Sequence, residues 1–389
     1  MDKKIALLFE LFRDALGTVS FPKEHLALLD EDTVRDLYTL AKKHDLAQIV
    51  ADRLGEFGLL TQSDVSQKLL KQQLLAVYRS ERLKAAYERI SAVLDKAAIP
   101  YLPLKGTVIR PLYPQPYYRT SCDIDVLVKE ESLEAAVSAL SEALPLEKEI
   151  ERAYHDVSLY IKGGIHLELH FSILENLPTM DKVLARVWDY TLPATEGSFQ
   201  RKMTSEFFLF HQITHAAYHF EKGGCGIRPL MDVFLILQKT EHDPETLDSF
   251  LQEAALSDFY RHVTALARVW FLNEPHTLVT EQMEAYLLEG GIYGSFENSV
   301  ASASSKHRGK YLFKRIFPPY KTLAKTFPSL TKCPILYPLF LVRRWFRVFN
   351  GKKRKRAVNE VKTSMAMTAE QKDGITALFD ALGLQEQKR

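Results

Sequence analysis

Asp123-Ile124-Asp125-Val126-Leu127-Val128 is a short aliphatic run rich in β-branched residues, and it predicts a strand. Residues two apart in a strand point to the same face, so Asp123 and Asp125 should project together. Adjacent carboxylates repel each other unless a cation lies between them, and Mg²⁺ prefers oxygen ligands of this kind. The stretch therefore indicates a strand with a divalent-metal site, and a merely polar strand edge is the competing interpretation.

Downstream, two runs that alternate with period two predict a β-hairpin. Residues 155–161 and 165–171 alternate in this way, and Lys162-Gly163-Gly164 joins them. The second run places His166, Glu168 and His170 on its polar face. If this strand lies beside the Asp123–Asp125 strand, Glu168 falls on the same side and adds a third carboxylate. Three such carboxylates can hold two Mg²⁺ or Mn²⁺ ions about 3.5–4 Å apart.

Upstream, Leu104-Lys105-Gly106-Thr107 follows an expected strand and opens an expected helix over 107–113. Backbone N–H groups at such a turn can hold a phosphate, and Gly106 would allow its close approach. Lys105 would supply a positive charge there. Arg119 would contact the same phosphates or brace the carboxylates, and the alternative for both cations is an ordinary surface position.

Helical patterns fill most of the remaining chain. Ser63 or Asp64 would cap the longest helix, and Gly374 interrupts the last one. We predict helices at 64–96, 131–144, 207–220, 229–238 and 369–382. The fold should be α+β and mostly helical, with a small mixed sheet between helical segments. Its expected parts are a helical region at 1–95, a core at 96–204, a helical domain that closes a cleft at 205–300, and a basic aromatic region at 301–389.

Three histidines, His211, His215 and His219, lie four residues apart on one expected helix. With Cys225 they have a spacing that could suit zinc, but a helix contact or a cleft lining is the simpler interpretation. On the next helix, Arg228 and Asp232 are also four apart and could pair with each other.

Composition indicates an ordinary globular protein without a disulfide framework. The chain has 389 residues, 46% of them hydrophobic, and three well-separated cysteines, so a reducing compartment is expected. Glu10 and Arg13 interrupt the first apolar run, which is not a convincing signal peptide. The sequence contains no run of about 18 apolar residues. We therefore expect a cytoplasmic protein.

The net charge of +2 conceals an uneven distribution. Between Glu297 and Glu360 there is no acidic residue, while 306–356 contains 16 lysines and arginines. The remainder carries 35 basic and 49 acidic residues. This segment also contains Tyr337, Phe340, Arg343, Arg344, Trp345, Phe346 and Arg347. It could bind nucleic acid, lie on the inner face of an anionic membrane, or form a packed helix with solvated cations.

Together, these motifs resemble the uncharacterised nucleotidyltransferase family of bacteria, within the polymerase-β-type superfamily. The resemblance covers roughly 35–300 and rests on an ordered set of segments. These are Leu104-Lys105-Gly106, Leu112-Tyr113-Pro114, Arg119, the Asp123–Val128 stretch, Leu167-Glu168-Leu169-His170, His211, His215 and Gly226-Ile227-Arg228-Pro229-Leu230-Met231-Asp232. One departure is Lys-Gly-Thr in place of the usual Gly-Ser or Gly-Gly ahead of the acidic pair.

The resemblance implies a metal-dependent enzyme that moves a nucleoside monophosphate from an NTP, ATP first, to an acceptor and releases pyrophosphate. Asp123 and Asp125 would bind the metals, and Glu168 would complete the site or help to deprotonate the acceptor. The implied nucleotide-binding residues are Lys105, Gly106, Thr107 and Arg119, and the implied cleft residues are His170, His211, His215, Arg228 and Asp232. The acceptor could be a small molecule, a peptide, a protein or an RNA end.

Two other functions compete with this one. The core could be a catalytically silent nucleotide-binding module whose basic C-terminal region recruits RNA or membrane, although such a module would not need three carboxylates. A metal-dependent phosphohydrolase that uses His44-Asp45 or His155-Asp156 lacks the other ligands it would require.

Overall fold

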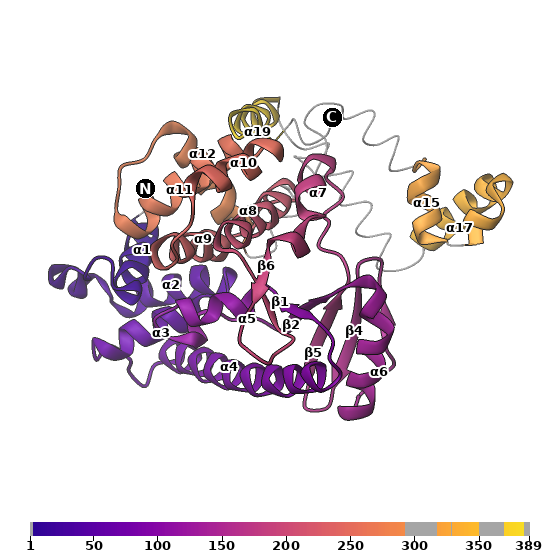
Figure 1. Ribbon diagram of the computed structural model, residues 1–389. Helices are drawn as coiled ribbons and strands as arrows, with labels where there is room; N and C mark the ends of the chain where they lie inside the picture. Colours follow the sequence, from indigo (N-terminus) through magenta and orange to yellow (C-terminus); the bar gives the residue numbers. More distant parts are fainter. Residues whose placement is uncertain (1–2, 292–316, 328, 350–368, 385–389) are drawn as a thin grey trace.

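A five-stranded mixed sheet forms the centre of the computed structural model, which describes residues 3–291, 317–327, 329–349 and 369–384 (Figure 1). Its strand order is β1-β2-β5-β4-β3. Only β2 and β5 run parallel; the other neighbours are antiparallel. The strands are β1 (Tyr101–Pro103), β2 (Asp123–Val128), β3 (Glu151–Arg152), β4 (Asp156–Ile161) and β5 (Ile165–His170). The predicted strand and hairpin are confirmed, as is the α+β, mostly helical fold class.

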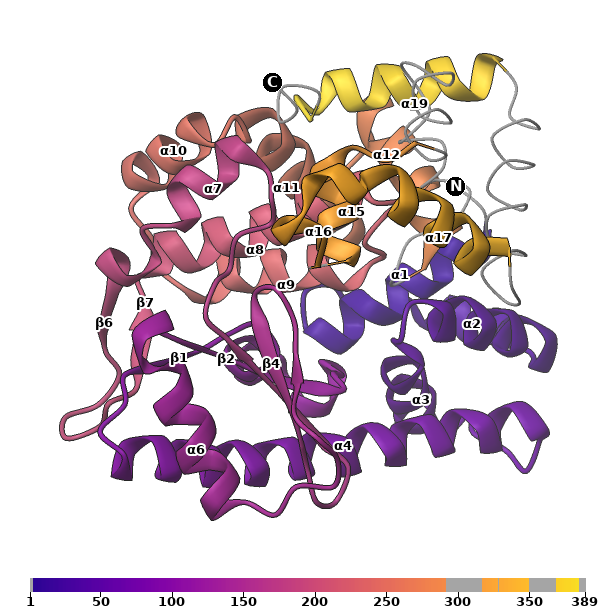
Figure 2. The ribbon, with the colours of Figure 1, turned by 90° about the vertical axis from the view of Figure 1, so that its right-hand side faces the viewer.

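One face of this sheet is apolar and packs on two helices. Helix α4 (Asp64–Lys96) crosses beneath the sheet, and α6 (Leu133–Ala143) lies beside it (Figures 1 and 2). The shared core joins strand residues such as Val126 and Leu167 to Ile90 of α4 and Leu140 of α6. Ser63 caps α4, as expected, by accepting a hydrogen bond from the Ser66 amide. Since residues in a strand alternate, the opposite face of β2, β4 and β5 is polar.

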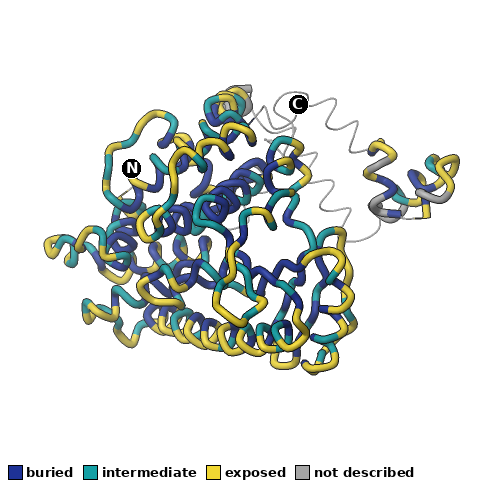
Figure 3. The backbone as a smooth tube through the Cα atoms, viewed as in Figure 1, coloured by how far each residue is buried: buried dark blue, intermediate teal, exposed yellow. Residues whose placement is uncertain are grey.

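A larger helical body packs around a second core, although its helices come from distant parts of the chain. Phe9 of α1 stacks on Trp270 of α11 with ring centroids 4.8 Å apart. Figure 3 shows mostly buried residues through the middle of this body, where α8 and α9 lie. The body contains α1 (Lys3–Leu16), α2 (Glu31–Lys43), α3 (Ala47–Glu56), α8 (Ser205–Glu221), α9 (Arg228–Lys239), α10 (Pro244–Glu253), α11 (Ser257–Leu272), α12 (Leu278–Gly290) and α19 (Ala369–Ala381).

Several shorter elements complete the described fold. They are α5 (Gly106–Ile109), α7 (Pro178–Leu184), and the two-stranded sheet of β6 (Thr191–Pro193) and β7 (Arg201–Met203). The helix expected over 107–113 is shorter than predicted. Its second half, Arg110–Leu112, is a 3₁₀ turn that contains Pro111, because proline lacks an N–H and disfavours helical backbone before it.

Part of the basic region is described and forms a small apolar cluster of its own. It contains α15 (Tyr320–Thr326), α16 (Ser329–Lys332) and α17 (Tyr337–Phe349), and Phe340 and Leu341 pack against Leu323 and Leu330. The rest of the basic segment predicted at 306–356 lies outside the described residues. In the described part of the chain, no helix is long and apolar enough to cross a membrane.

Candidate active site

The polar face of the sheet gathers the predicted carboxylates. In the parallel pairing of β2 and β5, Asp125 lies opposite Glu168, and Asp123 lies opposite His166. Intervening residues such as Ile124 and Leu167 point into the apolar core, so the acidic side chains share the other face. The sequence predicts that Glu168 lies beside the aspartates if the two strands are adjacent and in matching register. The structure has this arrangement.

Two cations contact the buried carboxylate of Asp125. Lys105 Nζ lies 3.1 Å from Asp125 Oδ1, and His170 Nε2 lies 2.9 Å from the same oxygen. Burial opposes ionisation of this carboxyl, but the charge of Lys105 and the hydrogen bond from His170 outweigh it and lower the pKa of Asp125. Lys105 has a φ of +43°, a strained conformation of the kind that clusters at functional sites.

His170 also joins Asp125 to Glu168. Its Nε2 lies 3.5 Å from Glu168 Oε2, and this interaction lowers the pKa of Glu168. Burial would lower the pKa of His170, yet hydrogen bonds to the two carboxylates raise it to about 9. The imidazole is therefore positively charged at neutral pH, and it balances part of the negative charge on this face.

Asp123 has the opposite electrostatic environment. Burial raises its pKa first, and repulsion from Asp125 and Glu168 raises it further. No ion pair to Asp123 is present among the described residues. Its carboxylate contributes to the wall of the pocket. A divalent cation bound here would neutralise the excess negative charge around Asp123.

The donors on this face fit a divalent metal. Asp125, Glu168 and His170 each offer a ligand atom, and these atoms lie within 4.8 Å of one another. With Asp123 beside them, three carboxylates offer the oxygen donors that Mg²⁺ and Mn²⁺ prefer. Asp125, Glu168 and His170 are the residues that the structure brings together for a metal, with Lys105 beside Asp125, and the part of Asp123 in this set stays a prediction.

A pocket of about 230 Å³ opens in front of Asp123 and Asp125. One water molecule needs only about 10–15 Å³ of such space, so a ligand of many atoms can enter. Of the predicted site residues, the lining includes Lys105, Gly106, Arg119, Asp123, Asp125, His215, Arg228 and Asp232. Thr107, Glu168, His170 and His211 are not part of the lining. Ser121 and Gln212, which the sequence had not indicated, also line it, as does Asp45, which the sequence had singled out only for a phosphohydrolase.

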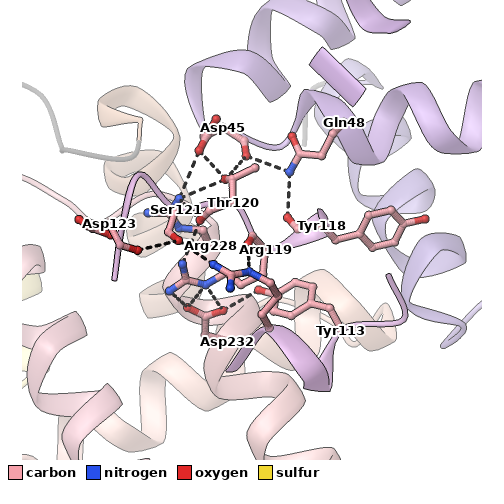
Figure 4. A network of polar contacts seen from close by, with 11 residues as sticks. Asp45, Gln48, Tyr113, Tyr118, Arg119, Thr120, Ser121, Asp123, Arg228 and Asp232 are labelled. Carbon is pink, nitrogen blue, oxygen red and sulfur yellow. Dashed lines mark hydrogen bonds and ion pairs between the residues drawn. The ribbon is translucent and has the colours of Figure 1, made fainter. Parts of the chain in front are cut away.

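On the far side of the pocket, a buried polar network differs from the pairing expected within α9 (Figure 4). Asp232 pairs with Arg119 rather than with Arg228: Arg119 Nη2 lies 2.9 Å from Asp232 Oδ2. The Tyr113 hydroxyl donates a 2.6 Å hydrogen bond to the same carboxylate. The pairing of Arg228 with Asp232 that their spacing suggested is therefore wrong. The buried guanidinium of Arg119 pairs with Asp232 instead. Arg119 does brace a carboxylate, but one on α9.

Arg228 instead faces the N-terminal helices. Its Nη1 lies 3.3 Å from Asp45 Oδ2 and donates a 3.2 Å hydrogen bond to the Thr120 carbonyl (Figure 4). Asp45 lies in the turn between α2 and α3. Nothing in the local sequence around Asp45 signals this contact, because it depends on how helices distant in the sequence pack together. The pocket wall is therefore formed by three regions of the chain.

The histidines of α8 do not form the zinc site that their spacing allowed. Among the described residues, the groups able to hold a metal are Asp125 with Glu168 and His170, and His155 with Asp156 and His170. His211 is buried beside Gln212, and burial lowers its pKa to about 3. His215 lies 3.2 Å from Glu175. Burial also raises the pKa of Cys225 to about 12, which disfavours a thiolate ligand.

Carboxylates on adjacent strands, next to an open pocket lined by lysine and arginine, are the groups that metal-dependent phosphoryl or nucleotidyl transfer uses. The sequence comparison makes the class more specific. Residues 30–272 match the family described as "Uncharacterised nucleotidyltransferase", and the chain belongs to that family. It is a transferase, as the resemblance implied. Comparison with curated proteins and with solved structures gives no significant match.

Proposed function

We propose that this enzyme transfers a nucleoside monophosphate from an NTP, ATP first, to an acceptor hydroxyl or phosphate. The observation that carries the proposal is the register of β2 and β5, in which Asp125 lies opposite Glu168. With Asp123, these carboxylates share one face, and the pocket opens in front of the two aspartates. The acceptor oxygen attacks the α-phosphorus, the bond between that phosphorus and the bridging oxygen breaks, and pyrophosphate leaves.

Each group near the pocket has a proposed role in this reaction. Asp123, Asp125 and Glu168 hold Mg²⁺ or Mn²⁺, and Glu168 also takes part in deprotonating the acceptor. When bound, the metal supplies charge neutralisation for the triphosphate and for the leaving pyrophosphate. Lys105 and Arg228 add positive charge to the wall, and Gly106 allows the phosphates to approach the backbone.

Four of the predicted nucleotide-binding and cleft residues act indirectly in this proposal. Arg119 and Asp232 are paired with each other, so they position the wall rather than the substrate. Thr107 is not part of the lining and serves the turn that presents Gly106. His170 orients Asp125 through its 2.9 Å contact. His211 and His215 belong to the helix that borders the cleft.

The test is transfer of label from α-labelled NTPs, with pyrophosphate release followed in parallel. Wild type is incubated with each common NTP, Mg²⁺ or Mn²⁺, and cell extract as the source of acceptor. The Asp123→Asn/Asp125→Asn variant should lose at least 10³-fold of the activity, by analogy with other lost electrostatic groups. Glu134→Gln, at an exposed carboxylate paired with Arg152, is the matched control and should retain activity.

A catalytically silent module would behave differently in the same assay. Wild type would release no pyrophosphate, and its nucleotide binding would not depend on Asp123 and Asp125. That result would overturn the proposal.

We also propose that the basic aromatic region contacts an anionic membrane surface, which would place the enzyme at the inner face of the cytoplasmic membrane. In the described part of this region, apolar side chains point outward: Ile335 is 87% exposed and Leu339 is 64% exposed. Leu339 and the exposed Val342 are three residues apart on α17, Ile335 lies in the 3₁₀ turn just before this helix, and Arg343 is exposed next to Val342. An exposed apolar stripe flanked by cations favours lipid over nucleic acid, because lipid offers both an acidic headgroup and an apolar interior.

A further inference from the structure

We propose a second metal site, formed by His155, Asp156 and His170, that takes a divalent transition metal such as Zn²⁺. The site lies at the end of the polar face, where β4 begins and β5 ends. Asp156 and His170 are directly opposite each other in the antiparallel pairing. His155 precedes Asp156 in the chain. None of the roles proposed for nucleotidyl transfer uses His155 or Asp156.

The three side chains already converge. His155 Nε2 lies 3.1 Å from Asp156 Oδ2, and the rings of His155 and His170 stack with centroids 5.7 Å apart. One ligand atom from each residue lies within 4.8 Å of the other two. Bonds of about 2.0–2.1 Å around one ion would bring such atoms to roughly 3–4 Å from one another. Small rotations of the side chains would therefore complete the set.

Two polar groups here are poorly satisfied without a cation. Asp156 is buried, and in the described part of the chain its carboxylate has His155 as its one ion-pair or hydrogen-bond partner. His155 Nδ1 is inaccessible to solvent and has no hydrogen-bond partner among the described residues. Buried polar atoms are normally hydrogen-bonded, so His155 Nδ1, which has no partner among the described residues, is open to a ligand. A bound cation would satisfy the carboxylate directly.

The donor set determines which metal is suitable. Two imidazole nitrogens and one carboxylate oxygen suit Zn²⁺, Co²⁺ or Mn²⁺, whereas Mg²⁺ takes oxygen donors. Three protein ligands leave a coordination position open for water or for a substrate oxygen. The side chain of His155 is 41% exposed, so an ion can enter from solvent.

Through His170, this site would be coupled to the carboxylates of the proposed active site. His170 Nε2 lies 2.9 Å from Asp125 and 3.5 Å from Glu168. The two sites share His170, which gives up its proton when it takes a metal, but their other ligands differ: His155 and Asp156 belong to one, and Asp123, Asp125 and Glu168 belong to the other. Substitutions can therefore test each site by itself.

The experiment titrates Co²⁺ into the full-length protein, prepared without a histidine tag, in excess Mg²⁺ that occupies the oxygen-donor site. Wild type should bind one equivalent with visible absorption bands of imidazole-ligated Co²⁺, and Zn²⁺ should displace it. His155→Phe keeps a ring against His170 but removes the donor nitrogens, so it should weaken binding at least tenfold. Asp123→Asn/Asp125→Asn should retain the bands, as should the control His242→Phe.

Several outcomes would overturn this site. Absence of the Co²⁺ bands in wild type contradicts the proposal directly. Equal Co²⁺ affinity of wild type and His155→Phe, with matching circular dichroism spectra, would do the same. Loss of the bands in Asp123→Asn/Asp125→Asn but not in His155→Phe would assign the metal to the carboxylate site instead. Failure of nucleotidyl transfer leaves these readouts unaffected, because they measure metal binding alone.

Discussion

At the scale of single residues, Asp123 and Asp125 show how two identical side chains on one strand face acquire different charge states. Lys105 and His170 contact Asp125 and lower its pKa, whereas burial and the neighbouring carboxylates raise the pKa of Asp123. The strand period places both groups together but does not determine which of them a cation reaches. That difference depends on the turn at Lys105 and on the end of β5.

His44 provides a pH-dependence prediction outside the site. Its side chain is fully buried, and burial followed by the charge of Lys43 lowers its pKa to about 4 from an ordinary 6.5. Between these values the unfolded chain takes up a proton that the folded protein does not. The contribution of His44 to folding stability is therefore lost as the pH falls from about 6.5 to 4, and it amounts to about 3 kcal/mol.

This prediction is checked by urea unfolding of wild type and His44→Leu at pH 8, 6.5, 5.5 and 4.5. The free energy of unfolding of each protein is compared with its own value at pH 8, where the imidazole is neutral in both the folded and the unfolded state. The effect of the substitution on packing therefore cancels. The variant should lose less stability than wild type on acidification. Identical pH profiles for the two proteins would contradict the assignment.

At the scale of elements, the register between β2 and β5 determines the site. Alternation sends Ile124, Val126, Leu167 and Leu169 into the core against α4 and α6, so the register cannot slip by one residue without exposing them. The same alternation turns Asp125 and Glu168 toward the pocket side. Burial of the apolar face thus holds the polar face in position.

The exposed apolar stripe near α17 leads to a membrane-binding prediction. Full-length protein should float with phosphatidylglycerol vesicles and not with neutral phosphatidylcholine vesicles, and salt should weaken the association. Ile335→Ser/Leu339→Ser/Val342→Ser removes the stripe and should reduce vesicle binding at least tenfold. Leu74→Ser is the matched control, because Leu74 of α4 is 69% exposed and lies in another part of the chain.

Nucleic acid is the other outcome of this measurement. Binding to RNA that the triple substitution leaves unchanged, with no flotation on anionic vesicles, would contradict the membrane proposal. Such a result would assign the basic residues to phosphate contacts along a nucleic-acid backbone.

At the scale of the whole molecule, the buried pair of Arg119 and Asp232 joins the sheet unit to the helical body. The two residues are 113 positions apart, and Tyr113 donates to the same carboxylate (Figure 4). Removal of one partner from a buried ion pair leaves an uncompensated charge, which costs about 3–5 kcal/mol. Asp232→Asn should therefore destabilise the protein by about that amount.

A double-mutant cycle in chemical denaturation checks this value. Arg119→Met/Asp232→Asn removes both charges and should be less destabilised than the sum of Arg119→Met and Asp232→Asn. Asp64→Asn, at an exposed pair with Lys68, is the control for loss of a surface carboxylate and should change stability by under about 1 kcal/mol. Additive effects at 119 and 232 would show that the pair does not couple the two units.

Much of this architecture follows from local patterns in the sequence. Period two identified β2 and the β4–β5 hairpin, and period 3.6 with Ser63 as cap identified α4. The predicted boundaries at 95, 204 and 300 stay predictions. The folded structure shows that α1 to α3 and α8 to α12 share one core. The periodicity of apolar residues does not show which distant segments a helix packs against or how deeply it is buried.

What the sequence by itself determined is which residues of the proposed site share a strand face: Asp123 with Asp125, and Glu168 with His170 on the neighbouring strand. Side-chain alternation is a property of the strand, so it needs no knowledge of the rest of the fold. Only the tertiary structure decided that Asp232 pairs with Arg119, that Asp45 borders the pocket, and that His155 and Asp156 meet His170. These contacts arise because packing of the hydrophobic cores brings distant segments within a few ångströms, and no local pattern encodes such distances.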